Sequence, residues 1–165
     1  MKIVKPSFEI LTPIDGISIL KTLEIAGRTC YKSEDKITDD SAQAFVRKLI
    51  KSGHEAMIEH FNISVRIICD RGVSHEIVRH RIASYAQEST RYCNYGKDGE
   101  ITVIEPFFWA EESPEYQLWR TSCLVAEDTY LYLIQQGTSP QEARSVLPNS
   151  LKTEIVVTSS GYGRH

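Results

Sequence analysis

The segment from His60 to Asp70 constrains the fold more than any other part of the chain, because apolar and polar residues alternate along most of it. Every second residue from Phe61 to Cys69 is apolar, and the residues between them include asparagine, serine and arginine. A period of two places the apolar side chains on one face of an extended strand, whereas a helix would scatter them around its axis. We therefore predict a strand over 60–70 that buries one face.

Three further segments are predicted to be extended: residues 2–11, 89–95 and 152–158. The last contains Ile155-Val156-Val157, which suits a closing strand because branched apolar residues are favoured in sheets. Residues 89–95 are expected to lie antiparallel beside 60–70. The turn Arg71-Gly72 separates that strand from the following helix, and Lys97-Asp98-Gly99 is typical of a turn.

Helices are expected where capping residues precede apolar residues spaced three and four apart. Thr38-Asp39-Asp40 caps a helix that ends at Gly53, and Ser113-Pro114-Glu115 opens the longest helix, which ends at Gly137. Ser139-Pro140-Gln141-Glu142 forms a capping box. A first helix after Asp15 is expected to bury Ile17, Leu20, Ala26 and Cys30. Together these elements predict an α+β fold, an antiparallel sheet flanked by helices.

The composition indicates one ordinary globular domain over residues 1–165. The chain is 41% hydrophobic and 25% charged, with a net charge of -3. Nucleic-acid and membrane partners usually require a positive surplus, and no apolar run is long enough to span a bilayer. We predict a cytoplasmic protein with no nucleic-acid or membrane partner. The four cysteines contain no CxxC pair, so reduced thiols are expected rather than disulfides or a zinc site.

Residues 79–92 hold three arginines, a histidine, two serines and two tyrosines. Guanidinium groups crowded together repel one another unless an anion lies among them, and their planar donor forks suit phosphate or a planar imide edge. Glu76 and Glu88 are too few to neutralise the arginines and satisfy every donor. The segment therefore predicts an anion site whose missing partner is a ligand.

The local pattern suggests how this site is built. A short helix over 73–82 places Glu76 on one face with Arg79 and His80, while Arg79 and Arg81 point in opposite directions. After Ala83 the pattern indicates a loop that leads into a strand. On that strand Ser89 and Arg91 would share one face. The two motif arginines are thus expected to serve different ligands or different subunits.

Neither histidine-rich segment fits a metal site. His54 and His60 are six apart, and His75 and His80 miss the zinc-protease spacing by one residue. We predict no metal. The aromatic run Phe107-Phe108-Trp109 is interpreted as core.

Arg79-His80-Arg81, followed by seven residues and Ser89, resembles the signature of the flavin-dependent thymidylate synthases. Further matches in order and spacing are Gly53-His54-Glu55, Glu59-His60, Thr90-Arg91-Tyr92, Ala143-Arg144 and Leu147-Pro148. The likeness covers nearly the whole chain. It implies the fold of that family and methylation of dUMP to dTMP, with methylenetetrahydrofolate as carbon donor and FAD, reduced by NADPH, as hydride carrier.

The resemblance also implies roles for individual residues. The flavin would contact His54, Arg79, His80 and Arg81. The dUMP would be held by Gln87, Ser89, Arg91 and Arg144, with Arg79 and Arg144 as the catalytic residues. Members of the family are homotetramers whose active sites are shared between subunits, so the same assembly is expected here. The segment Arg28–Ser33 is expected close to the active site.

The family usually continues beyond the strand at 152–158 into long helices that complete the pyrimidine and flavin sites. Residues 159–165 do not resemble that continuation, and the family more often has Asn and Arg where Ser160 and Tyr162 stand. The chain is therefore expected to lack the C-terminal helices of the family.

Three alternatives stay open. The chain could be a flavin- or nucleotide-binding relative that has lost turnover, which the unusual tail favours. It could be an RNA-binding module that stacks bases on Tyr85, Tyr92 and Tyr95, although the acidic net charge speaks against this. The arginines could also only bridge acids of the neighbouring helix and strand, but few acids lie nearby in the sequence.

Overall fold

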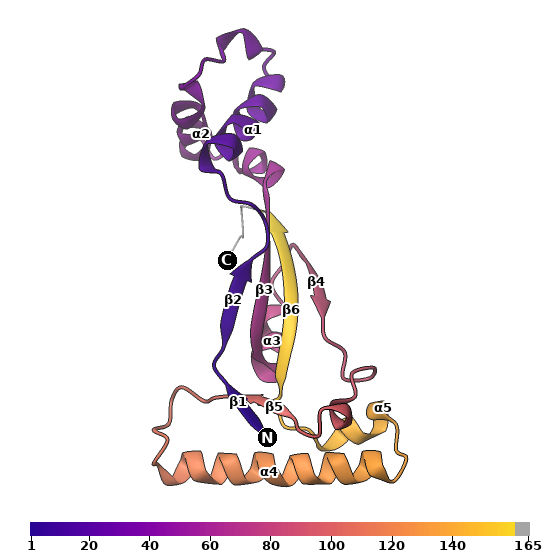
Figure 1. The fold of residues 1–165 in the computed structure, drawn as a ribbon. Helices are drawn as coiled ribbons and strands as arrows, with labels where there is room; N and C mark the ends of the chain where they lie inside the picture. The colour runs from indigo at the N-terminus through magenta and orange to yellow at the C-terminus, as the bar shows by residue number, and fades with distance from the viewer. Residues whose placement is uncertain (161–165) are drawn as a thin grey trace. The chain divides into compact units, whose positions relative to one another are not determined.

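A four-stranded sheet runs through the structure, a computed structural model that describes residues 1–160. Its strand order is β2 (Ser7–Ile10), β3 (Asn62–Asp70), β6 (Lys152–Ser160) and β4 (Ala83–Gln87). Neighbouring strands run in opposite directions (Figure 1). The α+β class, the antiparallel sheet and the strand predicted from the alternating segment are therefore confirmed. Residues 161–165, including Tyr162, lie outside the described part of the chain.

The strand predicted over residues 2–11 is split in two at Lys5-Pro6. Proline has no N–H to donate to a ladder, so the chain leaves one sheet there and joins another. The first piece, β1 (Lys2–Val4), pairs with β5 (Thr102–Ile104) in register from Lys2↔Thr102 to Val4↔Ile104. This small two-stranded sheet is parallel, unlike the larger one.

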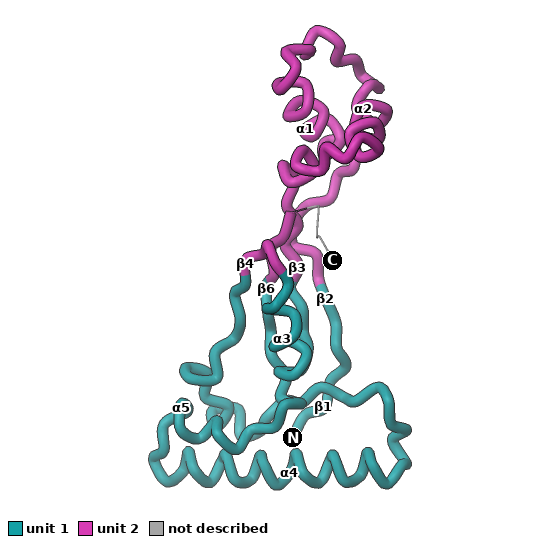
Figure 2. Tube along the Cα trace, turned by 180° about the vertical axis from the view of Figure 1, so that it is seen from behind, with its two compact units in different colours: residues 1–8, 66–80, 85–156 teal, residues 9–65, 81–84, 157–165 magenta. Residues whose placement is uncertain are grey.

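The chain forms two compact units that are interleaved in sequence (Figure 2). The first comprises residues 1–8, 66–80 and 85–156, and the second comprises residues 9–65, 81–84 and those from Val157 onward. Strands β3 and β6 each begin in one unit and end in the other. The assignment of residues 1–165 to a single domain stays a prediction.

In the first unit, the long helix α4 (Pro114–Gln135) covers the main core cluster. Ser113 caps it, its hydroxyl accepting a hydrogen bond of 3.2 Å from the Tyr116 N–H, as the sequence predicted. Cys123 and Tyr130 of α4 are buried together with Ile101, Val103 and Leu151. The capping box of α5 (Pro140–Ala143) is also present. Burial of each large apolar side chain stabilises the fold by about 1.5–3 kcal/mol.

Two predictions around the arginine-rich segment are wrong. Helix α3 (Arg71–Ile77) ends before the motif, so Arg79 and Arg81 do not lie on opposite faces of one helix. The next strand is β4, earlier than the predicted 89–95, and it neighbours β6 rather than β3. Ser89 lies in a turn, where its carbonyl accepts hydrogen bonds from the backbone N–H groups of Tyr92 and Cys93. Turn geometry overrode the alternating pattern there.

The aromatic run before α4 was predicted to be core, and this is wrong as well. The exposed fractions of Phe107, Phe108 and Trp109 are 91%, 63% and 37%. The three rings contact one another edge to face, with centroids 5.3 Å and 4.7 Å apart. Local stacking thus replaces burial in the core.

In the second unit, helices α1 (Gly16–Thr29) and α2 (Ser41–Lys51) pack closely. The buried residues of α1 are Leu23, Glu24, Gly27 and Arg28, so the predicted stripe is wrong, and Ile17 is 69% exposed. Gly27 explains why a different face of α1 is buried, because the helices are so close there that a methyl group would lie 2.7 Å from the Phe45 ring and 2.9 Å from Leu49. Ala42, Val46 and Leu49 of α2 are buried.

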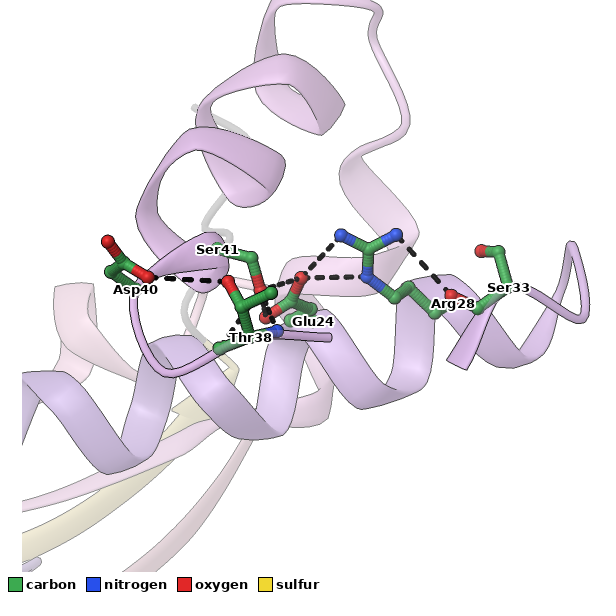
Figure 3. Close-up of polar contacts among 6 residues, drawn as sticks. All are labelled: Glu24, Arg28, Ser33, Thr38, Asp40 and Ser41. Carbon is green, nitrogen blue, oxygen red and sulfur yellow. Dashed lines mark hydrogen bonds and ion pairs between the residues drawn. The ribbon is translucent and has the colours of Figure 1, made fainter. Parts of the chain in front are cut away.

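A buried polar network joins the same two helices (Figure 3). Nε and Nη2 of Arg28 each lie 2.7 Å from Oε1 of Glu24, and the Ser41 hydroxyl lies 2.8 Å and 2.9 Å from the two Glu24 oxygens. The Arg28 guanidinium also lies 4.4 Å from the centroid of the Phe45 ring. Short 3₁₀ helices complete the fold at Glu34–Lys36, Glu55–His60, Tyr95–Lys97 and Arg144–Val146.

Candidate active site

The first motif arginine is exposed and paired with a nearby acid. Nη1 of Arg79 lies 3.0 Å from Oε2 and 3.3 Å from Oε1 of Glu76, which confirms the predicted contact three residues apart. Both side chains are more than 70% exposed, at 73% and 72%. The carbonyl of His80 accepts a hydrogen bond from the Tyr85 hydroxyl. Arg79 therefore stands beside solvent, held by an ion pair that a stronger anion can replace.

Arg81 lies in the second unit and lines a cavity of about 610 Å³. The other lining residues are Glu59, Asn62, Ile82, Ala83, Ser84, Thr158, Ser159 and Ser160. Most of this lining is hydroxyl, amide or charged, and the Ser159 hydroxyl donates a hydrogen bond of 3.3 Å to the Ile82 carbonyl. The volume lies within the range of small-molecule and cofactor sites. The cavity suits a ligand with several polar groups and negative charge.

His54 lies elsewhere in the second unit, just after the left-handed Gly53 (φ 71°) that follows α2. It lines a mostly apolar pocket of about 310 Å³ together with Gly27, Cys30, Tyr31, Leu49, Ala56 and Met57. The segment Arg28–Ser33, predicted to lie close to the active site, thus shares a pocket with His54.

Gln87 is used inside the first unit. Its amide nitrogen donates hydrogen bonds of 2.8 Å to the Ser74 hydroxyl and 3.2 Å to the Thr153 hydroxyl. Both acceptors are buried, with exposed fractions of 0% and 1%. Ser89 and Arg91 follow in the turn, where the Arg91 N–H donates a hydrogen bond of 3.4 Å to the Ser89 hydroxyl. The Arg91 guanidinium lies 5.2 Å from the Tyr92 ring centroid and is exposed.

Arg144 faces a third cavity, of about 440 Å³, in the first unit. Its Nη1 donates a hydrogen bond of 3.3 Å to the hydroxyl of Thr90, which is buried. The other lining residues are Arg71, Gln141, Ser145, Leu147, Pro148, Asn149 and Leu151. The structure therefore joins Arg144 to the turn that carries Ser89 and Arg91. Arg71, which sequence reasoning passed over as part of a turn, lines the same cavity.

Glu88, the acid inside the motif segment, is occupied by other partners. Its carboxylate accepts a hydrogen bond of 2.7 Å from the Tyr95 hydroxyl and lies 3.5 Å from the Lys152 ammonium. Burial, and then this hydrogen bond, raise the pKa of Tyr95 well above its ordinary value. Glu88 forms no ion pair with an arginine among residues 1–160.

Residues 1–160 contain neither a metal-binding cluster nor a membrane-spanning helix. No group of three or more His, Cys, Asp or Glu side chains within residues 1–160 could hold a metal ion. In the same part of the chain, no helix combines the length and the apolar character that a membrane crossing needs.

Known proteins resemble this chain over most of its length. A family model described as "Thymidylate synthase complementing protein" matches residues 17–162. A flavin-dependent thymidylate synthase of Geobacter sulfurreducens is 35% identical over 81% of this chain and 60% of its own length. One of Mycolicibacterium gilvum is 34% identical over 94% of this chain and 67% of its own length.

A solved structure has a similar fold. The UMP/dUMP methylase PolB from Streptomyces cacaoi, bound with 5-Br dUMP, aligns with a TM-score of 0.76 at 22% identity, covering 97% of this chain and 75% of PolB. The chain spans about 60% of the length of the Geobacter relative. Because the family model spans most of the chain and the relatives carry the name that the Arg-His-Arg motif predicted, the chain belongs to the family of the flavin-dependent thymidylate synthases.

Proposed function

We propose that the chain provides the catalytic core for methylation of dUMP to dTMP, with methylenetetrahydrofolate as carbon donor and an NADPH-reduced FAD as hydride carrier. The observation that carries the proposal is the family match together with the complete motif from Arg79-His80-Arg81 to Ser89. The cavities at Arg81 and Arg144 support it, since each offers a guanidinium to an anionic ligand.

A flavin fits the residues of the second unit. The cavity at Arg81 offers hydroxyl and amide groups for a polar, negatively charged ligand, and the pocket at His54 is apolar enough for an aromatic ring. We assign flavin contacts to His54 and Arg81 of the second unit, and to Arg79 and His80 of the first unit because the resemblance implies them. When bound, the reduced flavin would supply the hydride that completes the new methyl group.

The residues of the first unit are assigned to dUMP. Arg144 suits the phosphate, because its cavity is lined by no acid. Arg79 suits the uracil edge: its guanidinium can exchange the exposed Glu76 for the ring carbonyl. There it would stabilise the negative charge of the enolate form of the ring, whose C5 supplies the electron pair that forms the bond to the methylene carbon of the folate. Ser89 and Arg91 would complete the nucleotide contacts from the turn.

Gln87 requires a narrower role than the resemblance implies. Its amide protons are directed at Ser74 and Thr153, so dUMP can use only the amide oxygen or the backbone of this residue without breaking those bonds. We propose that Gln87 fixes β4 through these two hydrogen bonds and contacts dUMP through its amide oxygen or its backbone.

We also propose the homotetramer and the cytoplasmic location that the resemblance implies. Shared active sites would explain why exposed arginines such as Arg79 and Arg91 protrude into solvent from a single chain. Size-exclusion chromatography with light scattering checks this, and a stable monomer that binds flavin would contradict it.

The function is tested first by the absorption spectrum of the purified protein after addition of FAD. NADPH is then added anaerobically, with and without dUMP, and dTMP is measured once methylenetetrahydrofolate is present. We expect a flavin spectrum that bleaches faster with dUMP, and formation of dTMP. We expect Arg81→Ala to lose flavin and Arg144→Ala to raise the KM for dUMP, while the surface variant Arg120→Ala behaves as wild type.

The same assay separates the alternatives. Binding of FAD and dUMP without dTMP formation would assign the chain as a binding relative without turnover. Absence of both binding events, with a salt-dependent shift of single-stranded RNA, would favour the RNA-binding alternative.

A further inference from the structure

A cavity of about 580 Å³ adjoins the pocket at His54 in the second unit. Tyr31, Leu49 and His54 line both, so a ligand in one can extend into the other. The remaining lining comes from α1, from the 3₁₀ helix Glu34–Lys36 and from α2, and consists of Arg28, Ser33, Lys36, Phe45, Lys48 and Ser52. The volume lies within the range of small-molecule sites.

The cavity is lined by cations and by no acid. Lys36 and Lys48 are exposed, and within residues 1–160 neither ammonium group forms an ion pair. Glu34 and Asp35 precede Lys36 in the same 3₁₀ helix but do not line the cavity. Arg28 adds no free charge, because its buried ion pair neutralises it. Two positive charges are therefore open to an anionic ligand.

The C-terminal end of α2 lies at the same cavity, and free carbonyl groups at a helix end would repel an anion. Here the carbonyl groups of residues 48–50 accept hydrogen bonds of 3.0–3.1 Å from the N–H groups of residues 52–54. Lys48, in the last turn of the helix, adds a positive charge at this end. The helix end is therefore compatible with an anion beside Lys48.

Tyr31 and Phe45 add aromatic rings to the lining. Tyr31 is 65% exposed, and the Phe45 ring lies 4.4 Å from the Arg28 guanidinium. Aromatic rings offer large apolar contact areas to a flat group of a ligand. The lining therefore suits a ligand that carries a flat ring followed by negatively charged groups.

The tail of methylenetetrahydrofolate has this order of groups, a benzoyl ring followed by a glutamate with two carboxylates. Two free ammonium groups match two carboxylates in charge, whereas the three phosphate groups of NADPH carry about four negative charges. The flavin and dUMP are assigned to other residues, at Arg81 and His54 and in the first unit.

We propose that Lys36 and Lys48 bind the glutamate carboxylates of methylenetetrahydrofolate, with its benzoyl ring beside Tyr31 and Phe45. This inference rests on the proposed function for the identity of the ligand. The site itself, a cavity that binds an aromatic carboxylate, stands on the lining and its charge.

Fragments of the two co-substrates test the site without turnover. Ligand-observed NMR measures binding of p-aminobenzoyl-glutamate, of 4-aminobenzamide, which lacks the carboxylates, and of 2′,5′-ADP, which represents NADPH. We expect p-aminobenzoyl-glutamate to bind most tightly. In Lys36→Gln and Lys48→Gln its Kd should rise about 3- to 10-fold each, as expected for solvent-exposed charge pairs. Lys51→Gln is the matched control, because it removes the same charge from the last turn of α2 outside the cavity.

Steady-state kinetics of dTMP formation adds a second readout. We expect each of the two lysine variants to raise the KM for methylenetetrahydrofolate about 3- to 10-fold while kcat changes less than about twofold, because the tail stays bound in the transition state. The KM values for dUMP and NADPH should not change. Lys48→Arg should retain most of the affinity, since it keeps the charge.

The outcomes separate this inference from the proposed function. Fragment binding that weakens in Lys36→Gln and Lys48→Gln but not in Lys51→Gln supports the site, even if no dTMP is formed and the proposed function fails. Wild-type affinity in the double variant Lys36→Gln/Lys48→Gln overturns the site, while dTMP formation by wild type would leave the proposed function standing. Equal affinity for 4-aminobenzamide, or preference for 2′,5′-ADP at these lysines, overturns the assignment to the folate carboxylates.

Discussion

Glu24 and Arg28 form a buried ion pair one helical turn apart, with two guanidinium nitrogens each 2.7 Å from the same carboxylate oxygen. The side chains are 1% and 10% exposed. Ser41 from α2 donates to the same carboxylate, so the pair holds α1 and α2 together as well as neutralising itself (Figure 3). Nearby, Arg28 donates to the Ser33 carbonyl at 3.4 Å and so positions the segment that leads from Tyr31.

Glu24→Ala should destabilise the protein strongly, because it leaves the Arg28 charge buried without its acid. Loss of one partner of a buried pair typically costs about 3–5 kcal/mol. Chemical denaturation with urea measures this, with the exposed variant Glu112→Ala as control. The double variant Glu24→Leu/Arg28→Met should recover much of the loss. A Glu24→Ala protein as stable as the control would show that the pair contributes little.

Gly27→Ala should separate α1 from α2. The added methyl group would lie 2.7 Å from the Phe45 ring, and overpacking of this kind costs about 1–3 kcal/mol. Gly16→Ala is the matched control, since its methyl group meets nothing within 4 Å and should stabilise the helix by about 0.4–1 kcal/mol. Thermal unfolding of both variants checks the prediction, and equal melting temperatures would contradict it.

Gln87→Glu should be destabilising at neutral pH although the two side chains have nearly the same shape. The Ser74 hydroxyl already donates its proton to the Arg71 carbonyl, so it needs a donor at position 87, which a carboxylate is not. We expect a loss of about 1–3 kcal/mol, comparable to Gln87→Ala. Gln43→Ala on the exposed face of α2 serves as control. A Gln87→Glu protein that melts at the wild-type temperature would rule out this hydrogen-bond assignment.

The four cysteines should differ in reactivity toward iodoacetamide at pH 8. Burial raises the pKa of the Cys69 thiol to about 11, and it also raises that of Cys123, whereas Cys30 is exposed. Only a small fraction of Cys69 is therefore thiolate, and thiolate is the reactive form. Mass spectrometry of the native protein should find Cys30 alkylated first, with all four labelled in urea. Rapid labelling of native Cys69 would contradict its burial.

The same thiol makes stability depend on pH. Since the pKa of Cys69 is raised in the folded state from 9.0 to about 11, its contribution is complete below pH 9 and is lost as pH rises toward 11. Urea midpoints between pH 8 and pH 11 measure this loss, which Cys69→Ala should reduce.

The starts of α4 and α5 and the strand β3 could be predicted from the sequence, because each depends on residues that are close together in the chain. Ser113 caps α4 and Ser139 opens α5 because a hydroxyl must satisfy the first free N–H groups of a helix, whatever surrounds it. Strand β3 followed from its alternation. The predictions fail where contact with a second segment determines which residues are buried. Ile17 is exposed because α1 approaches α2 at Gly27 and not at an apolar side chain.

In the candidate site, too, a contact between residues close in sequence was predicted, whereas contacts between distant residues were not. Arg79 and Glu76 are close in sequence, and their contact was predicted. Arg71 and Arg144 are far apart in sequence and share a cavity only through the hydrogen bonds between α3 and the segment before β6, which no local pattern records. Gln87 was predicted to be a site residue, but its partners Ser74 and Thr153 come from two other elements and could not be read from spacing.

The interleaving of the two units limits how this protein can be divided. The chain passes from one unit to the other after residues 8, 65, 80, 84 and 156, and one of these passages separates His80 from Arg81. A single proteolytic cut or gene truncation therefore cannot release either unit whole. Recombination with a relative at one crossover point would replace parts of both units at once. Natural variation in this chain is accordingly expected to proceed by point substitution and loop insertion rather than by exchange of either unit.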